Sequence, residues 1–125
     1  MIVAGFGFRT EATLSALQEA FAHAQRGLPC VTLLATPHDK MTLVEPLADA
    51  MNLPLLAILP NALRSTRTPT QSVASLEARR TGSVAEACAL AAAGPGARLL
   101  TCRHISLDRM ATCAIARSDA QGPAA

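Results

Sequence analysis

The sequence contains few of the side chains that nucleic-acid-binding proteins use. It has no Trp, no Tyr, three Phe and one Lys, and its formal net charge is only +2. Base stacking needs aromatic rings and phosphate binding needs a basic excess, so we expect no nucleic-acid partner. The sequence also lacks a signal-peptide pattern and an apolar run of the roughly 18 residues that a membrane span requires. We therefore expect a cytoplasmic protein with no membrane partner.

The four cysteines show no Cys-x-x-Cys spacing, which marks many metal and redox sites. They are Cys30, Cys88, Cys102 and Cys113, and each lies within an apolar stretch. Free cysteine packs as a small hydrophobic side chain, so we interpret all four as buried, reduced thiols. We predict neither a structural metal site nor a cofactor.

Half of the 125 residues are hydrophobic, which is enough to form the core of one domain. The elements alternate between strand and helix in the first half, and two strand-like segments follow in the second. This order predicts an α/β fold, a single-domain three-layer α/β/α sandwich with a mixed sheet of about five strands. We place the domain at residues 1–117 and a flexible tail at 118–125. The expected strands are at the amino terminus and at 30–36, 55–59, 98–105 and 110–117; the expected helices are at 10–26, 42–51 and 84–93.

The segment Met1–Thr10 reads as a strand that ends in Gly-x-Gly and meets a helix. Glycines let backbone amides approach a bound group, and a helix N-terminus favours negative charge. With Arg9 and Thr10 close by, the segment predicts a turn that binds an anionic small molecule. The alternative is that Gly5 and Gly7 only let the chain turn tightly into the helix.

A second candidate cluster lies in residues 60–82, which we expect to form a long irregular connection with at most a helical turn at 73–80. Arg64 and Arg67 stand there among several Ser and Thr residues. Two guanidinium groups and neighbouring hydroxyls can bind several carboxylates, and long loops are often functional. The alternative is an ordinary solvated connection.

Two segments have the spacing of a capping box, in which a Ser or Thr and a Glu three residues later bond each other's backbone amides. Thr42 and Glu45 predict the start of one helix, with Pro46 in its first turn. Ser83 and Glu86 predict the start of another, whose terminus can form the edge of a binding site.

Three segments together resemble the CobE family of cobalamin-biosynthesis proteins, which is similar to the C-terminal domain of the CbiG family. The segments are Gly5–Arg9, Gly82–Gly94 and Ala111–Ala116, and their order extends the resemblance over almost the whole chain. The family pattern commonly begins Gly-x-Gly-Cys-Arg, whereas this chain has Phe8 at the cysteine position. A role that depends on that thiol therefore cannot be transferred.

The resemblance implies a role in building the corrin ring, whose intermediates carry many acetate and propionate carboxylates. The first hypothesis is that the chain binds a corrinoid or precorrin intermediate, as a carrier or as an accessory to another cobalamin-pathway enzyme. The residues that we assign to ligand binding are Gly5, Gly7, Arg9, Thr10, Arg64, Arg67, Ser83, Glu86 and Thr112.

The alternative hypothesis is a small hydrolase that opens a precorrin lactone during ring contraction, a step with which full-length CbiG-like proteins are associated. Glu86, His38 and His104 are the candidate bases. Cys102 and His104 are two residues apart, which places them on one face of a regular strand, and a buried thiol beside a hydrogen-bonded histidine is the simpler interpretation. No pair has persuasive catalytic spacing, so the catalytic residues stay unassigned.

Overall fold

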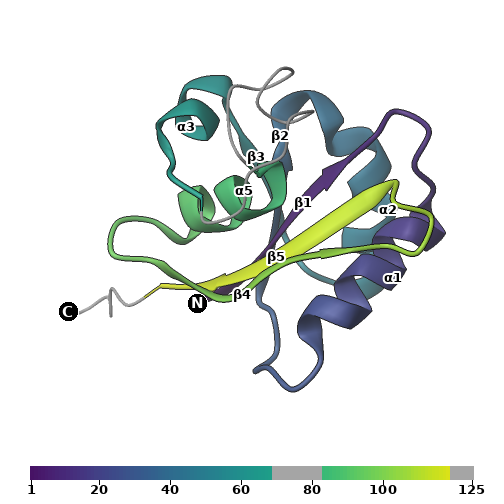
Figure 1. Ribbon diagram of the computed structural model, residues 1–125, viewed down its shortest axis with the longest axis horizontal. Helices are drawn as coiled ribbons and strands as arrows, with labels where there is room; N and C mark the ends of the chain where they lie inside the picture. Colours follow the sequence, from purple (N-terminus) through teal and green to yellow (C-terminus); the bar gives the residue numbers. More distant parts are fainter. Residues whose placement is uncertain (69–82, 119–125) are drawn as a thin grey trace.

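Five strands form one mixed sheet in the order β3-β2-β1-β5-β4 (Figure 1). The computed structural model describes residues 1–68 and 83–118. β1, β2 and β3 are parallel, whereas β5 pairs antiparallel with both β1 and β4. The mixed five-stranded sheet expected from the sequence is confirmed. The strands are β1 (Ile2–Phe8), β2 (Leu33–Pro37), β3 (Leu55–Ile58), β4 (Arg98–Ile105) and β5 (Ala111–Arg117).

Helices cover both faces of the sheet and produce the three expected layers. Helices α1 (Leu14–Gln25) and α2 (Met41–Met51) pack on one face, around Phe6 and Leu34. Helices α3 (Pro60–Ser65) and α5 (Val84–Ala93) pack on the other, around Val3, Ala35 and Ile58. Alternate residues of each central strand therefore enter two separate cores, as the pleat of a strand requires.

Gly5 and Gly7 lie inside β1, so the prediction that they form a turn after the strand is wrong. Both pair with β5, opposite Ala114 and Thr112 respectively. Neither has a positive φ, so the backbone conformation at these two positions does not require glycine. A Cβ at Gly5 would overlap the backbone of Ala85 and Ala89 in α5. These glycines allow a helix to pack directly on the strand.

Helix α1 begins later than expected, at Leu14 and not at residue 10. Thr13 is its N-cap, because the Thr13 hydroxyl accepts a hydrogen bond of 3.1 Å from the Ala16 N–H. Glu11 therefore precedes the helix and does not lie in its first turn. The Gly-x-Gly segment is not followed directly by a helix N-terminus.

Helix α2 has the expected end but not the expected cap. The short 3-10 helix η1 (His38–Lys40) leads directly into Met41, and no side chain caps α2. Thr42 is therefore already helical, and the capping box predicted for Thr42 and Glu45 does not form. Pro46 lies inside the helix rather than in its first turn. Its missing N–H deprives the carbonyl of Thr42 of a helical donor, at an exposed position where water can replace it.

The segment expected to be irregular begins with a helix. Pro60 starts α3 at the first helical position, where a missing N–H has no cost, and α3 continues to Ser65. The helical turn expected at residues 73–80 lies outside the described residues. The flexible tail expected at 118–125 also lies outside them, apart from Ser118, whose N–H donates to the Met1 carbonyl.

The expected hairpin at the end of the chain is confirmed. The turn between β4 and β5 is stabilised by Asp108, whose carboxylate accepts hydrogen bonds from the Ser106 hydroxyl and the Met110 N–H. Arg109 adopts a left-handed conformation at φ 62°. The register of β4 shifts twice, between Leu99 and Thr101 and between Thr101 and His104. Each shift inserts one extra residue into β4, which is a β-bulge.

None of the four cysteines forms a disulfide, and only two of them are buried. Cys88 and Cys113 lie in the core as expected, and burial raises the pKa of the Cys113 thiol far above its ordinary value. Cys30 and Cys102 are exposed, so the prediction of burial is wrong for them. Cys30 precedes β2, and Cys102 lies in the bulged edge strand. Among the described residues, no helix is long and apolar enough to span a membrane.

Candidate functional site

Several chain segments meet at one edge of the sheet, which we call the carboxyl edge. The parallel strands β1, β2 and β3 end there, and the antiparallel strand β5 begins there beside the end of β4. The first turn of α5 also lies there, because Val84 packs on Gly7 whereas Ala89 packs on Gly5. Ligands of open α/β sheets bind outside the carboxyl ends of the strands. This edge is therefore the candidate site.

Gly7, Thr112 and the start of α5 form the centre of this edge. A Cβ at Gly7 would lie 2.9 Å from the Cβ of Val84 and 3.1 Å from the Thr112 hydroxyl oxygen. The Thr112 hydroxyl donates a hydrogen bond of 3.1 Å to the Gly7 carbonyl. The structure thus brings together Gly7, Thr112 and Ser83, three of the residues predicted from the sequence to bind ligand.

Ser83 caps α5, as the capping box predicts. The Ser83 hydroxyl accepts a hydrogen bond of 3.3 Å from the Glu86 N–H, and Ser83 is almost fully buried. The carboxylate of Glu86 reaches the edge strand β4, where its Oε2 accepts a hydrogen bond of 2.9 Å from the Arg103 N–H. Glu86 is 0% exposed. Its charge lies in the first turn of α5, where the helix dipole stabilises a negative group.

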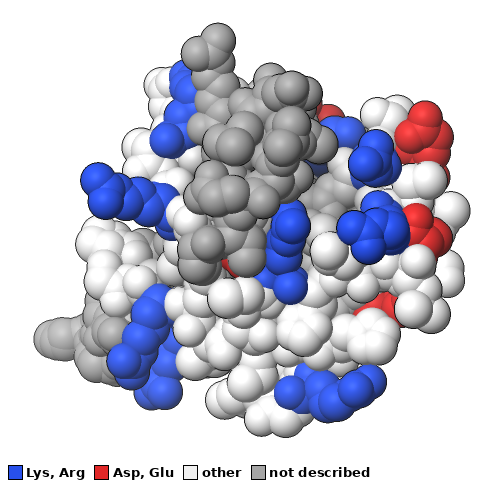
Figure 2. Space-filling view, viewed as in Figure 1, with Lys and Arg blue, Asp and Glu red and all other residues white. Residues whose placement is uncertain are grey.

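Two cationic residues, Arg9 and Lys40, follow strands that end at the carboxyl edge. Arg9 is exposed, one residue beyond β1, and its N–H donates to the Met110 carbonyl at 2.8 Å. Thr10 is exposed in the turn that follows. On the α1 and α2 side, the Lys40 Nζ lies 5.2 Å from the centroid of the Phe8 ring. On the face seen in Figure 2, Lys and Arg are spread over the surface and do not form one continuous patch.

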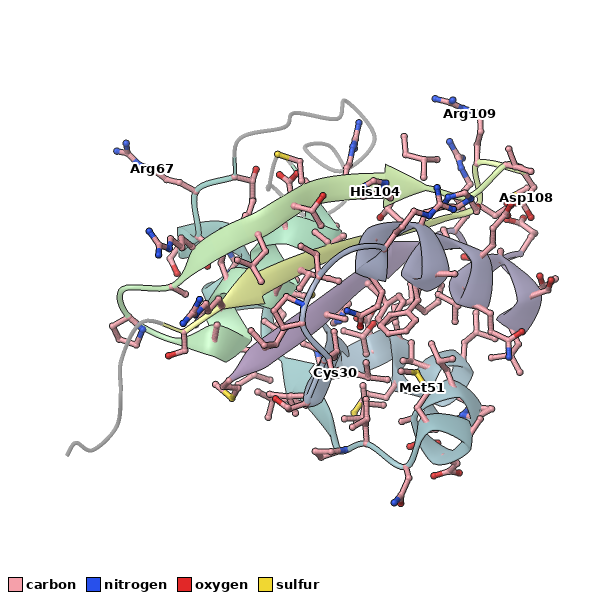
Figure 3. The ribbon with its side chains drawn as sticks, turned by 90° about the horizontal axis from the view of Figure 1, so that it is seen from below. Cys30, Met51, Arg67, His104, Asp108 and Arg109 are labelled. Atoms are coloured by element: carbon pink, nitrogen blue, oxygen red, sulfur yellow. The ribbon has the colours of Figure 1, made fainter. Side chains whose placement is uncertain are left out.

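The structure separates Arg67 from this centre. Arg67 lines an open hollow of about 600 Å³ together with the C-terminal part of α5 and the loop after it. Ten residues of α5 at a rise of 1.5 Å put roughly 15 Å between its two ends. Figure 3 shows Arg67 at the opposite end of the molecule from Asp108 and Arg109. Arg64 lies in α3, and its guanidinium donates to the Asn61 side chain.

The histidine and cysteine candidates for catalysis do not form a pair. The Nε2 of His104 lies 2.9 Å from the Thr101 hydroxyl oxygen, so this ring already has a hydrogen-bond partner. The bulge between Thr101 and His104 interrupts the alternation of side chains along β4. Cys102 therefore does not share a face with His104, contrary to the expectation from the sequence. His38 lies in η1. Within the described ranges, no group of three or more His, Cys, Asp or Glu side chains could hold a metal ion.

The family model described as "Cobalamin synthesis G C-terminus" matches residues 2–116. The chain belongs to this family. The match covers every described helix and all five strands except the last residue of β5, including both sides of the carboxyl edge. A search of curated proteins found no match.

Solved structures agree with this family assignment. The chain is 27% identical to CobE, described as a protein from the cobalamin (vitamin B12) biosynthetic pathway, with a TM-score of 0.82 over 94% of this chain and 89% of CobE. It is 33% identical to the cobalamin biosynthesis protein chiG from Agrobacterium tumefaciens, with a TM-score of 0.73 over 95% and 99% of the two chains. The resemblance to CobE and the CbiG C-terminal domain is confirmed, and the chain is a cobalamin-biosynthesis protein.

A cobalamin biosynthesis protein G homolog from Sulfolobus solfataricus shares the fold at 19% identity and a TM-score of 0.72. The alignment covers 94% of this chain but 37% of that protein. The common fold is therefore one part of a longer relative.

One side chain near the carboxyl edge was not among the candidates from the sequence. Arg103 is half-buried in β4, and its backbone is bonded to Glu86 at the start of α5. The sequence gives little indication that Arg103 faces the site. Two bulges interrupt the alternation of side chains along β4, and they become visible only in the strand pairing.

Proposed function

We propose that this cobalamin-biosynthesis protein binds a carboxylate-rich corrinoid or precorrin intermediate at the carboxyl edge. The proposal is supported by the meeting of Gly7, Thr112 and Ser83 at this edge, with the exposed Arg9 one residue beyond the end of β1. Gly7 lets the first turn of α5 pack on the end of β1, and guanidinium groups near this edge can bind carboxylates in paired hydrogen bonds. Gly5 would act indirectly, by allowing α5 to pack on β1.

Binding is favoured over hydrolysis by the surroundings of the candidate bases. Glu86 is fully buried and bonded to a backbone amide of β4, and the His104 ring is bonded to Thr101. A general base needs to reach the proton that it removes. We therefore propose a carrier or an accessory that passes its ligand to another enzyme of the pathway. The four cysteines form no disulfide, which fits a reducing compartment such as the cytoplasm.

Titration of the purified protein with dicyanocobyrinic acid, followed by its absorbance spectrum, tests this function. The corrin probe carries free acetate and propionate side chains, and its heptamethyl ester is the matched control without charge. Saturable binding of the acid, weaker binding of the ester and an unchanged mass of the recovered probe are expected. If neither the acid nor other corrin-pathway intermediates changed the spectrum, the proposal would be contradicted. A new mass for any recovered compound would show that the protein is an enzyme.

A further inference from the structure

The edge strand β4 is bulged at the point where it meets α5. Thr101 pairs with Ile115 and His104 pairs with Cys113, so Cys102 and Arg103 stand opposite the single residue Ala114. A bulge turns one backbone N–H away from the neighbouring strand. Here the N–H of Arg103 donates to the Glu86 carboxylate at 2.9 Å. Glu86 therefore holds the bulge against the first turn of α5.

The register also assigns Arg103 to a face of the sheet. Ile105 pairs with Thr112, whose hydroxyl lies beside Gly7 on the α5 face. Ala114 lies two residues from Thr112 in the unbroken strand β5 and so shares that face, and the register puts Arg103 opposite Ala114. Arg103 therefore lies on the α5 face, the same face as Thr112, Gly7 and Ser83.

The buried carboxylate changes what α5 can contribute to anion binding. The N-terminus of a helix attracts negative charge, but the charge of Glu86 already lies within the first turn. That charge repels a ligand carboxylate that approaches this turn, and a cation at the same edge favours its approach. Arg103 is half-buried, and its backbone is already fixed to Glu86.

We propose that Arg103 is a ligand-contacting cation of the carboxyl edge and that Glu86 is the positioning residue that holds it there. This inference rests on the proposed function and assigns Glu86 a new role, since it contacts the Arg103 backbone and not the ligand. The ligand group that Arg103 recognises is a carboxylate on the rim of the ring. The planar guanidinium matches a carboxylate in a way that an ammonium does not.

One variant of Arg103 and two of Glu86 separate these roles. Arg103→Gln removes the cation but keeps the backbone N–H, and it is expected to weaken binding of dicyanocobyrinic acid about tenfold or more. Binding of the heptamethyl ester should not change. Arg117→Gln is the matched control, because Arg117 is exposed at the other end of β5 and should leave both affinities unaltered.

Glu86→Gln keeps an oxygen that can accept the Arg103 N–H, so it should bind the acid as well as the wild type or better. Glu86→Ala should lower the affinity for the acid and speed hydrogen exchange of the backbone amide of residue 103. Glu86→Gln and Arg103→Gln should leave that exchange slow, because both keep the hydrogen bond to this amide. The double variant of Glu86→Ala with Arg103→Gln should bind no more weakly than Arg103→Gln alone, because both changes remove one interaction. Melting curves show whether each variant is folded.

The outcomes distinguish this inference from the proposed function. If the wild type fails to bind the acid, the proposed function is wrong and Arg103 has no ligand to contact. If the wild type binds and Arg103→Gln binds equally well, the function stands and the inference is overturned. If Glu86→Gln abolishes binding while the Arg103 amide stays protected, Glu86 contacts the ligand itself and its positioning role is wrong.

Discussion

At the scale of single residues, Gly5 is the position where the fold has no space for a side chain. The carbonyl of Ala85 and the backbone of Ala89 occupy the volume that a Cβ would need, and helix backbone cannot move as a side-chain end can. Gly5→Ala is expected to destabilise the protein by about 1–3 kcal/mol, measured by denaturant unfolding.

Gly27→Ala is the control for Gly5→Ala. Gly27 has a φ of 76° but open space around it, so this change adds only backbone strain of about 1–2 kcal/mol. If Gly5→Ala left the unfolding midpoint unchanged, α5 would not pack on β1 as described.

The thiols are expected to fall into two classes of reactivity. Cys30 and Cys102 are exposed and should react with a thiol reagent in the native protein. Cys88 and Cys113 are buried, and burial raises the pKa of Cys113, so its reactive thiolate is scarce. Native and unfolded samples should therefore differ by two modified cysteines, as mass spectrometry can count. Equal modification in both states would contradict the burial of Cys88 and Cys113.

The sequence identified Gly5 and Gly7 as positions of close approach but not what approaches them. The local sequence pattern suggested that these glycines serve the helix that follows next in the chain. The helix that packs on them is α5, about eighty residues later. Long-range packing of this kind has no local signal. Glu86 illustrates the same limit, because the capping box was visible in the sequence and its bond to β4 was not.

At the scale of elements, the two capped helices allow a matched comparison. The Thr13 hydroxyl caps α1 at an exposed position, and the Ser83 hydroxyl caps α5 in the interior. Replacing a cap by Ala costs about 0.5–2 kcal/mol of stability. Ser83→Ala should lie near the upper value and Thr13→Ala near the lower, because the hydrogen bond of the Ser83 cap is buried whereas that of the Thr13 cap is only partly buried. Thermal unfolding measures both, and the reverse order would contradict this account.

The turn between β4 and β5 should weaken in acid. The Ser106 hydroxyl, and then the Met110 N–H, donate hydrogen bonds that lower the pKa of Asp108 from its ordinary value of 3.8. A lowered pKa in the folded state stabilises the protein above 3.8, and this contribution is lost as the pH falls through the lowered value.

NMR titration of the Asp108 carboxyl group should therefore give a midpoint below 3.8. Asp108→Asn cannot titrate, so its stability should depend less on pH over this range than that of the wild type. A midpoint at or above 3.8 would show that the hydrogen bonds do not form in solution.

The elements with strong local signals were predicted well. Alternating strands and helices, the Ser83 cap and the final hairpin are each encoded in a few adjacent residues. The start of α2 was predicted to within one residue, but its cap was wrong, because η1 leads directly into the helix and Thr42 is already helical. Helix α3 was missed because six residues are too few for a visible period, although Pro60 suits a first helical position.

At the scale of the whole molecule, the fold gathers residues that are distant in the sequence. Gly7, Ser83 and Thr112 meet at the carboxyl edge because β1 is the central strand, with β5 beside it and α5 across it. The same arrangement directs Arg67 to the other end of α5. Sequence reasoning assigned all of these residues to one ligand site because of their chemistry. The topology shows that Arg67 lies apart from the carboxyl edge.

An NMR titration of the protein with dicyanocobyrinic acid would locate the bound probe through the amide chemical shifts. The largest shifts are expected at Gly7, Arg9, Ser83 and Thr112, with little change at Arg67 and Gly94. Shifts centred on Arg67 and Gly94 would place the ligand in the hollow at the other end of α5. That result, or no shifts at all, would contradict a binding site at the carboxyl edge.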